Sequence, residues 1–243
     1  MDRLYAILGD IHANLEALEA VIEDARSQSV TDFLCVGDVV GYNASPRECV
    51  EKVRALDCAT VRGNHDHYCS HHDPLEGFHP MAAMVIEWTR RQLREEDVEW
   101  LQGLPYERKV SRIALVHGTL DMPDQWGYVF DILEAEASMI LQDTAVCFHG
   151  HTHVPLRFEL RLGDVMRLPP EDFRLVFGTR YFVNVGSVGQ PRDGVPFGSY
   201  AIYDVKARQI RFRRVPYDIE TAMEKNRRAG LPERLAERLA VGR

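Results

Sequence analysis

The stretch of sequence that decides the fold lies at residues 4–12 and reads LYAILGDIH. It opens with an unbroken apolar run, Leu4–Leu8, which is the pattern of a strand buried on both faces. A glycine closes the run, and Asp10 and His12 follow at its carboxyl end. From Asn14 the apolar residues adopt a helical spacing, and asparagine is a favoured helix cap. The chain therefore begins with a strand, a polar turn and a helix.

The same unit occurs once more along the chain, and a third strand with its own polar turn follows. Phe33–Val36 predicts a second strand with Asp38 at its exit, and a capping box that opens at Ser45 starts the next helix. Cys58–Val61 predicts a third strand, which leads into the polar turn at residues 63–66. Strands that alternate with helices predict a parallel sheet with right-handed crossovers. The carboxyl ends of such strands lie at one edge, so we expect the polar turns to converge there.

The middle of the chain continues with helices, strands and a histidine-rich segment. Tyr68–Pro80 holds His71, His72 and His79, and it predicts either a cap over the polar turns or a solvated surface loop. Near residue 127, Trp126 and Tyr128 could line a pocket, but packing is the commoner role of aromatic side chains. Helices are predicted at Met81–Leu93, Glu95–Leu101 and Ile132–Leu141, and strands at Lys109–Val116 and Ala145–Phe148.

After residue 155 strands follow one another without helices between them. They are predicted at Leu156–Leu162, Val165–Leu168, Arg174–Phe177, Tyr181–Val185, Tyr200–Asp204 and Ile210–Val215. This succession predicts a second, mostly antiparallel sheet packed on the first. Helix signals return in a tail from about residue 216, at Ile219–Arg228 and Pro232–Leu239. With 45% apolar residues to fill a core, we expect a single domain over residues 1–243.

Composition argues against several classes of protein. A formal net charge of −8 and a pI of about 5.7 do not suit a nucleic-acid scaffold, although a local positive pocket stays possible. Five cysteines without a Cys-x-x-Cys pair predict reduced thiols in a cytoplasmic protein. Leu4–Leu8 is too short for a signal peptide, and no apolar run is long enough to span a bilayer. We expect no membrane contact, and the oligomeric state stays open.

The polar turns carry side chains that bind metals. Taken singly, Asp10 could cap a helix, Asp38 could close an Asx-turn, and a histidine such as His149 is more often a core residue than a ligand. The pairs Asp10-x-His12 and His151-x-His153 favour another interpretation. Residues i and i+2 of an extended segment point the same way, so each pair could hold one ion. Together the turns offer oxygen and nitrogen ligands for more than one metal ion.

In their order along the chain, five of these blocks resemble the calcineurin-like metallophosphoesterase superfamily. The blocks are Asp10-x-His12, Gly37-Asp38, Gly63-Asn64-His65-Asp66, His117-Gly118 and Gly150-His151-Thr152-His153. The resemblance spans residues 4 to about 204 and is closest to the small bacterial and archaeal phosphodiesterase-like branch. In that branch, residues 184–187 and Pro191-Arg192 also have counterparts. The resemblance implies an α/β (α+β) fold, a four-layer α-β-β-α sandwich in which two mixed sheets are flanked by helices.

The resemblance also implies a binuclear metal centre. One ion would be held by Asp10, His12 and His153, and the second by Asn64, His117 and His151, with Asp38 bridging the two. The cofactors would be two divalent transition-metal ions, and the ligand types do not distinguish manganese, iron, zinc, nickel and cobalt. Two carboxylates against two dications leave a local charge of about +2, which would attract a phosphate despite the acidic chain.

Five residues are predicted to serve the reaction, either at the substrate or by orienting a neighbour. His65 would stabilise or protonate the departing oxygen, and Asp66 would orient the ring of His65. Alternatively, His65 is a turn residue bonded to the backbone. Tyr42 and Asn43, together with Asn64, are the predicted substrate contacts, although Tyr42 and Asn43 could equally form an ordinary turn.

The function implied is hydrolysis of a phosphodiester or phosphomonoester bond of a small substrate, by attack of a hydroxide activated between two metals. Protein phosphatases of the superfamily carry Asp-Arg-Gly in the second block, whereas Val39 follows Asp38 here. The missing arginine favours diesters or nucleotide-type substrates unless Arg62 or Arg192 compensates; Arg62 is more simply a solvent-facing strand end. Two alternatives stay open: a non-catalytic, metal-binding interaction scaffold of the same fold, similar to the retromer subunit, and a dinucleoside polyphosphate hydrolase.

Overall fold

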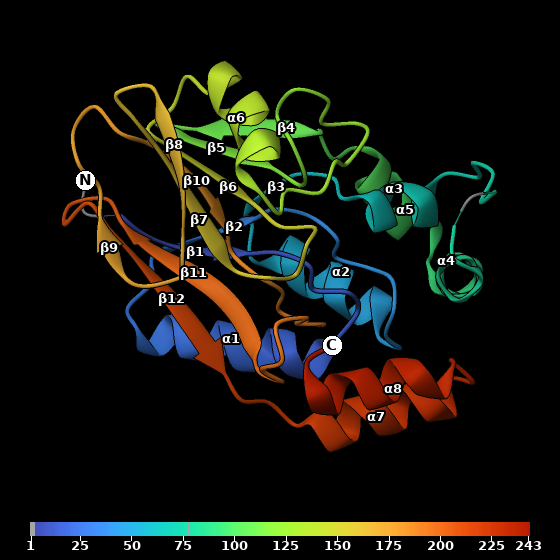
Figure 1. Cartoon of the computed structure of the whole chain (residues 1–243). Coiled ribbons are helices and arrows are strands. Elements are labelled where there is room, and N and C mark those ends of the chain that lie inside the picture. The colour runs from blue at the N-terminus through green and yellow to red at the C-terminus, as the bar shows by residue number, and fades with distance from the viewer. Residues whose placement is uncertain (1–2, 77) are drawn as a thin grey trace.

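Two mixed β-sheets form the centre of the computed structural model, which describes residues 3–76 and 78–243 (Figure 1). Sheet A contains, in order, β3 (Ala59–Thr60), β2 (Asp32–Cys35), β1 (Leu4–Leu8), β11 (Gly198–Asp204), β12 (Gln209–Val215) and β9 (Phe173–Arg174). Sheet B contains β4 (Glu107–Val110), β5 (Ile113–Val116), β6 (Val146–His149), β10 (Arg180–Asn184), β7 (Leu156–Arg161) and β8 (Asp164–Leu168). In sheet A, β1 is parallel to β2 and antiparallel to β11. In sheet B, β10 is parallel to β6 and antiparallel to β7.

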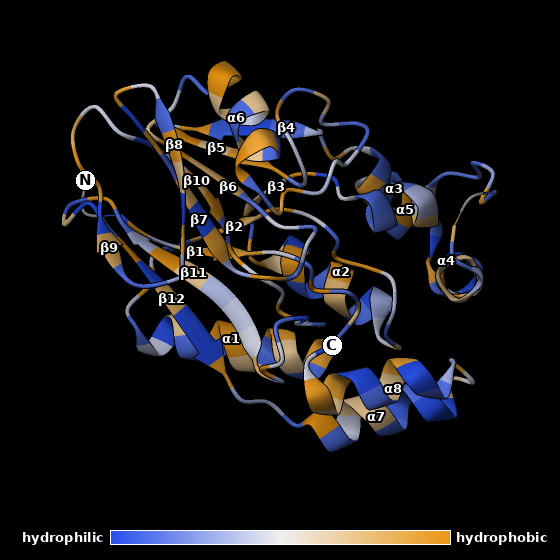
Figure 2. Cartoon of the chain, in the orientation of Figure 1, coloured by the Kyte–Doolittle hydropathy of each residue, from blue (hydrophilic) through white to orange (hydrophobic). Residues whose placement is uncertain are grey.

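Helices flank both sheets. They are α1 (Leu15–Ser27), α2 (Pro46–Ala55), α3 (Asn64–Ser70), α4 (Pro80–Gln92), α5 (Glu95–Gln102), α6 (Ile132–Leu141), α7 (Ile219–Arg228) and α8 (Glu233–Val241). Helix α1 lies along the outer face of sheet A, and α6 lies over sheet B (Figure 1). Figure 2 shows apolar and polar patches on the same helices, as expected when one helix face is buried. The predicted sandwich of two mixed sheets flanked by helices is confirmed.

The alternating side chains of the central strands build these layers. In β1, Ile7 packs between the two sheets, whereas Leu8 packs on the side of α1. In β6, Phe148 packs between the sheets, whereas Cys147 joins the cluster under α6. Successive side chains of a strand point to opposite faces, so each strand contributes to two apolar layers. This explains why the central strands read as unbroken apolar runs.

The division of strands between the sheets differs from the sequence prediction. Strands β5 and β6 come from the half in which strands and helices alternate, yet they belong to sheet B. Strands β11 and β12 come from the later half, yet they complete sheet A. The predicted strand Lys109–Val116 is in fact the hairpin of β4 and β5, which turns at Ser111 with a φ of 57°. Local patterns therefore gave the type of most elements but not their partners.

Helices α7 and α8 form the tail that was predicted from about residue 216. Leu231 and Leu235 pack against Val85 of α4. The Asn226 amide donates a hydrogen bond of 2.7 Å to the side-chain oxygen of Asn43, which lies in the loop after β2. The tail therefore rests beside the carboxyl ends of the sheet A strands. The single-domain assignment stays a prediction. In the part of the chain that the structure describes, every helix is too short or too polar to cross a membrane.

Candidate metal centre

The predicted ligands come together where the parallel strands end. Asp10 and His12 follow β1, Asp38 follows β2, and His117 follows β5. Three groups have ligand atoms that all lie within 4.8 Å of one another: Asp10, His12 and His153; Asp38, His117 and His151; and His12, Asp38 and His65. The first group is one of the two sets implied by the sequence, the second joins His117 and His151 of the other set to the bridging Asp38, and the third links the two. Convergence of the polar turns at one edge is what the strand order requires.

Asp38 lies between the two sets of imidazoles. Its Oδ2 atom is 3.5 Å from Nε2 of His12 and 3.3 Å from Nε2 of His117. Its other oxygen accepts a hydrogen bond of 2.8 Å from the backbone N–H of His65. On the far side, Oδ1 of Asp10 is 3.3 Å from Nε2 of His153. One carboxylate oxygen therefore faces imidazoles of both sets, which is compatible with the bridging role that the resemblance implies for Asp38.

The histidine tautomers are set by backbone carbonyls. The Nδ1 atoms of His12, His117 and His153 lie 3.2, 2.8 and 2.6 Å from the carbonyls of Val40, Val36 and Gln190, respectively. A neutral ring that donates Nδ1–H carries only a lone pair on Nε2. The Nε2 atoms of His12 and His153 are 3.0 Å apart, so two lone pairs face each other. A shared metal ion turns this repulsive pair into two ligands, and such backbone contacts are typical of metal-binding histidines.

The backbone at this edge is strained. Five predicted ligands have left-handed φ angles between 49° and 68°: Asp10, His12, Asp38, His151 and His153. Left-handed angles are uncommon for residues other than glycine, and such strain gathers at functional sites. The sequence prediction had placed Asp10 and His12 in an extended exit, and that backbone geometry is wrong. A single left-handed residue re-aims the chain, so both side chains still reach the site.

Two glycines make room for the carboxylates. A Cβ atom on Gly63 would collide with the carboxylate of Asp38, and one on Gly150 would collide with that of Asp10. Both glycines stand immediately before a predicted ligand, Asn64 and His151. Each glycine therefore allows its turn to approach a carboxylate closely, that of Asp38 for Gly63 and that of Asp10 for Gly150.

Asp66 organises the turn after β2 instead of orienting His65. One of its oxygens accepts hydrogen bonds of 2.7 and 3.0 Å from the N–H groups of Asp38 and Gly63, and the other accepts from Val39 and Val40. The predicted contact with the His65 ring is absent from the hydrogen bonds of the described residues. Asp66 also caps α3, a helix where the sequence predicted only a turn. Its carboxylate fixes the loop that carries Asp38.

Two side-chain atoms in the site are buried without a hydrogen-bond partner among the described residues. They are Oδ1 of Asn64 and Nδ1 of His65. A buried polar atom without a partner is costly, so each such atom requires an explanation. An amide oxygen is a suitable ligand for a divalent ion, and an unpaired ring nitrogen is free to meet a substrate. The donor set therefore fits two metal ions held by oxygen and nitrogen.

Burial and charge displace the pKa values of the site. Burial raises the pKa of Asp10 and of Asp66 to about 7. Burial lowers the pKa of His117, but the neighbouring Asp38 outweighs it and brings the value to about 9. Burial also opposes ionisation of Asp38, yet the adjacent His117 holds its pKa below the usual range. The His65 ring is desolvated, which lowers its pKa to about 4. Displacements in both directions within one cluster are typical of a functional site.

A cleft of about 420 Å³ opens over this cluster. The predicted site residues that line it are Asp38, Tyr42, Asn64, His65, His151 and His153. Asp10, His12 and His117 lie beneath its floor and are fully buried. Asn43 does not line the cleft: its amide donates to the carbonyl of His12 and its oxygen accepts from Asn226. Its position gives the predicted substrate contact no support.

The histidine-rich segment forms one wall of the cleft. Glu76, Phe78 and His79 line it, which favours the cap interpretation of Tyr68–Pro80. The first residues of that segment belong to α3. Gly77 was part of the same prediction and lies outside the described residues.

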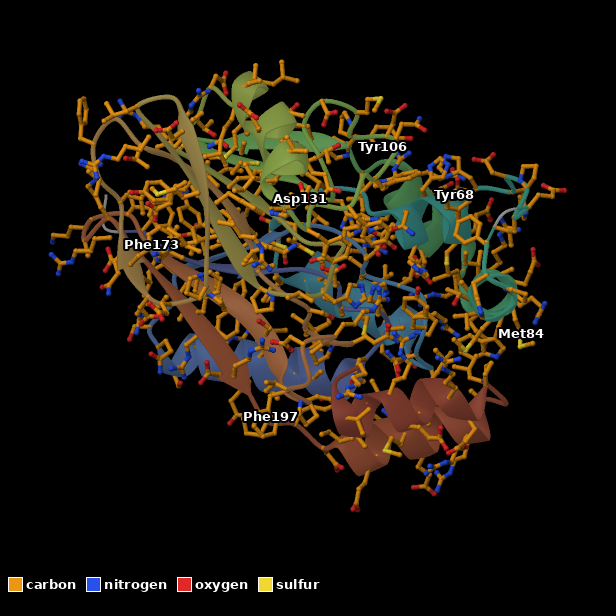
Figure 3. All side chains as sticks on the ribbon, in the orientation of Figure 1. Tyr68, Met84, Tyr106, Asp131, Phe173 and Phe197 are labelled. Carbon is orange, nitrogen blue, oxygen red and sulfur yellow. The ribbon has the colours of Figure 1, made fainter. Side chains whose placement is uncertain are left out.

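The two aromatic residues near residue 127 have different roles. Trp126 packs 5.8 Å from Tyr68 and 5.9 Å from Tyr106 between ring centroids, and Figure 3 labels both tyrosines. Tyr128 instead lines the cleft and stacks on His151, with ring centroids 4.0 Å apart. Trp126 therefore has a packing role, whereas Tyr128 forms part of the pocket wall. Nothing in the local sequence distinguishes the two side chains, because both are aromatic with a polar end.

Of the two arginines considered as substitutes, only Arg192 reaches the cleft. Arg62 is buried, and it donates to the carbonyl of Gln102 and lies over the ring of Tyr106. It is neither a solvent-facing strand end nor part of the site. The guanidinium carbon of Arg192 lies 5.6 Å from the ring centroid of Tyr42. Arg192 thus supplies positive charge beside the predicted metal ligands.

Comparisons with known proteins agree with this geometry. A metallophosphoesterase from Sphaerobacter thermophilus has a solved structure that superposes with a TM-score of 0.89, at 41% identity over 100% of both chains. An uncharacterised protein of Methanocaldococcus jannaschii is 37% identical over 99% of this chain and 98% of its own. A symmetrical bis(5'-nucleosyl)-tetraphosphatase of Coxiella burnetii is 31% identical over 54% of this chain and 46% of its own.

A family description matches most of the chain. Residues 4–208 match the calcineurin-like phosphoesterase superfamily domain. All seven predicted metal ligands lie within this matched range. The resemblance drawn from the sequence is therefore confirmed. The chain belongs to the calcineurin-like phosphoesterase superfamily.

Proposed function

We propose that the protein is a metal-dependent hydrolase of phosphoric esters with a binuclear centre. One observation carries the proposal: the Nε2 atoms of His12 and His153 face each other at 3.0 Å while their Nδ1 atoms are engaged by carbonyls. Neutral imidazoles in that arrangement need a cation between them. Asp38 lies between this pair and His117, which supports a second ion.

The proposed ligands are the residues named from the sequence. Asp10, His12 and His153 would hold one ion, and Asn64, His117 and His151 the other, with Asp38 shared. When bound, two such ions supply Lewis acidity and lower the pKa of bound water toward 7. The contribution of the chain is to fix the ligands: carbonyls set the tautomers, and Asp66 secures the turn that carries Asp38.

His65 is the proposed group for the departing oxygen. Its ring lines the cleft, its Nδ1 atom has no partner in the described residues, and its backbone N–H is tied to Asp38. Desolvation holds its pKa at about 4, so the ring is neutral at pH 7. A neutral imidazole still donates one hydrogen bond. This supports stabilisation of the departing oxygen over full proton transfer.

Tyr42 and Tyr128 form walls of the cleft above the proposed metals. The absence of an arginine directly after Asp38 supports diesters over phosphoproteins as substrates. Cleavage of a dinucleoside polyphosphate is a second candidate, favoured by the 31% identity to the Coxiella burnetii tetraphosphatase over 140 residues. Less than half of that protein is covered, so its activity enters here only as a proposal.

Hydrolysis of bis-p-nitrophenyl phosphate with added Mn²⁺ tests the function. The Asp38→Asn variant should lose about 10²-fold or more of kcat/KM, because the shared carboxylate positions both ions. Its metal content, measured by elemental analysis, should fall in parallel. Asp164→Asn changes an exposed carboxylate in the β7–β8 hairpin and should match the wild type.

A scaffold without catalysis predicts a different result. In that case the wild type would bind metal but hydrolyse no ester with manganese, iron, zinc, nickel or cobalt. Equal activity of the wild type and Asp38→Asn would also contradict the binuclear mechanism.

A further inference from the structure

A larger cleft adjoins the metal centre on the side of the tail helices. It encloses about 700 Å³ and shares Tyr42, His79, Ala82 and Arg192 with the cleft above the metal ligands. Its outer wall comes from α8, which packs against α4 through Leu235. The two spaces therefore form one continuous depression, with the shared residues at the junction.

The outer cleft is strongly positive in an acidic protein. Four arginines line it, Arg192, Arg234, Arg238 and Arg243, against the single carboxylate of Glu237. Within the described residues, none of these four guanidinium groups forms an ion pair with an aspartate or glutamate side chain, unlike Arg227 and Arg228. The formal net charge of the chain is −8, so this local excess of positive charge runs against the composition. We call this space the basic cleft.

Other arginines on the same tail behave differently. Arg227 pairs with Glu233 at 2.6 Å, and Arg228 pairs with Glu224. The tail therefore has carboxylates available, but Arg234 and Arg238 are not matched with them. These two residues are separated by one helical turn, so they lie on the same face of α8, which borders the cleft.

Arg192 and Arg238 bring like charges together in partly buried surroundings. Arg192 donates a hydrogen bond of 3.0 Å to Gln190, and its Nε atom is buried without a partner in the described part of the chain. Arg238 donates through Nε to the main-chain oxygen of Arg243. Burial lowers the pKa of Arg238, and the charges of Arg192 and Arg234 lower it further. Unpaired charges of one sign in a cleft create a potential that concentrates the opposite charge.

Building on the proposed hydrolysis, we propose that the basic cleft binds a second phosphate group of the same substrate. The substrate class is then a small organic polyphosphate or bisphosphate, in which one phosphate meets the metals and another meets Arg192, Arg234 and Arg238. Planar guanidinium groups are well matched to phosphate oxygens. A space of about 700 Å³ suits a small molecule. An extended nucleic acid is disfavoured by the formal net charge of −8.

The first experiment compares two substrates across matched variants. Diadenosine tetraphosphate has several phosphates and can place one in each cleft. Bis-p-nitrophenyl phosphate has a single phosphate, which would lie at the metal ligands. For Arg234→Ala and for Arg238→Ala, the ratio of kcat/KM for the tetraphosphate to kcat/KM for the diester should fall about tenfold, because a charge-assisted hydrogen bond is lost. Arg228→Ala removes the same charge from a paired arginine outside the cleft and should leave the ratio unchanged.

A binding measurement separates this inference from the proposed catalysis. Isothermal titration of inorganic tripolyphosphate into chelator-treated protein should give an affinity that Arg234→Ala weakens about tenfold and Arg228→Ala does not. Arg238→Lys, which keeps a positive charge, should weaken it less than Arg238→Ala. Arg234 is exposed, so its substitution leaves folding intact, and circular dichroism checks this.

The outcomes are distinct. If no ester is hydrolysed but tripolyphosphate binds in an Arg234-dependent way, the proposed function fails and the basic cleft stands as a phosphate site. If the diester is hydrolysed, but Arg234→Ala and Arg238→Ala change neither the ratio nor the affinity, the inference is overturned and the proposed function stands. Failure of the wild type to bind tripolyphosphate also overturns it.

Discussion

Asp38 and Asp24 are carboxylates of the same chain in opposite situations. Asp24 in α1 accepts hydrogen bonds of 2.7 and 3.0 Å from Arg213 and one of 2.6 Å from the hydroxyl of Tyr200. Asp38 is almost fully buried, and its free oxygen faces His12 and His117 at more than 3.2 Å. Among the described residues, no lysine or arginine forms an ion pair with Asp38.

The difference separates structural from functional acids. A half-buried carboxylate that holds the fold together is supplied with its own cation, as Asp24 is. Buried carboxylates without one are expensive, because desolvation penalises their charge. Asp10 and Asp38 have only histidines as ion-pair partners among the described residues, which supports the proposed cation site, and the orphaned Oδ1 of Asn64 supports it too.

Metal loading should have the largest effect on stability. Two sites, each at about 100 times its dissociation constant, would stabilise the folded state by about 5 kcal/mol. For a chain of this size, that corresponds to a rise in Tm of about 10–20 °C. Differential scanning calorimetry of chelator-treated protein, before and after addition of Mn²⁺, measures it. An identical Tm with and without Mn²⁺ would mean that no cation stabilises Asp10 and Asp38, and the contrast with Asp24 would fail.

Substitution of His65 should be the next largest effect. His65→Ala removes the proposed donor to the departing oxygen and should lower kcat about 10²–10³-fold while both metals stay bound. Elemental analysis checks the metals, and His72→Ala changes an exposed histidine of the neighbouring loop as the control. Unchanged kcat would remove His65 from the mechanism; loss of metal would make it a ligand, as its place beside His12 and Asp38 allows.

Asp66→Asn should destabilise the protein by about 2 kcal/mol. An amide in place of the carboxylate would turn a donor toward the backbone N–H groups that Asp66 now satisfies, so buried donors lose their acceptor. Urea unfolding measures the cost. Asp57→Asn, at an exposed left-handed position, is the matched control. Equal midpoints for Asp66→Asn and the wild type would mean that the hydrogen bonds of Asp66 do not stabilise the turn after β2.

Local sequence patterns predicted much of this molecule. Leu4–Leu8, Ile132–Leu141 and Ile219–Arg228 begin and end as predicted, because hydrophobic period and capping residues are properties of neighbouring positions. The family and the sandwich were reached from five short blocks. Their residues meet at one sheet edge because they follow strands that run parallel.

Outside the five blocks, contacts between distant segments were not predicted. The pairing of β11 with β1 joins residues almost 200 positions apart, and nothing in either strand marks the other. Asp66 was assigned to its neighbour His65, whereas its real partners lie in the turn at residues 38–40. The basic cleft needs α8 to fold back beside Tyr42. Only the spacing of Arg234 and Arg238, opposite the apolar face of α8, was available as a signal.

The smallest effect should come from Asp24, the acid that has its own cation. Burial favours its neutral form, but the hydrogen bonds of Arg213 and Tyr200 outweigh this and lower the pKa of Asp24. A depressed pKa contributes stability above the unfolded-state value, near pH 4, and this is lost as pH falls through the folded-state value. Because solvent screens the pair, Asp24→Asn should cost at most about 1 kcal/mol at pH 7.

The pH dependence makes this last effect diagnostic. Once Asp24 is protonated the wild type loses the same interaction, so the difference in unfolding free energy between wild type and Asp24→Asn should shrink from pH 7 toward pH 3. Urea unfolding of metal-free protein at the two pH values measures this contribution of Asp24 without any contribution from bound metal. A difference that stays constant with pH would mean that packing with Tyr200, not the charge of Asp24, joins α1 to sheet A. In that case Asp24 would no longer serve as the example of an acid stabilised by a cation of the chain. Only the results on the metal site would then support the comparison of Asp24 with Asp38.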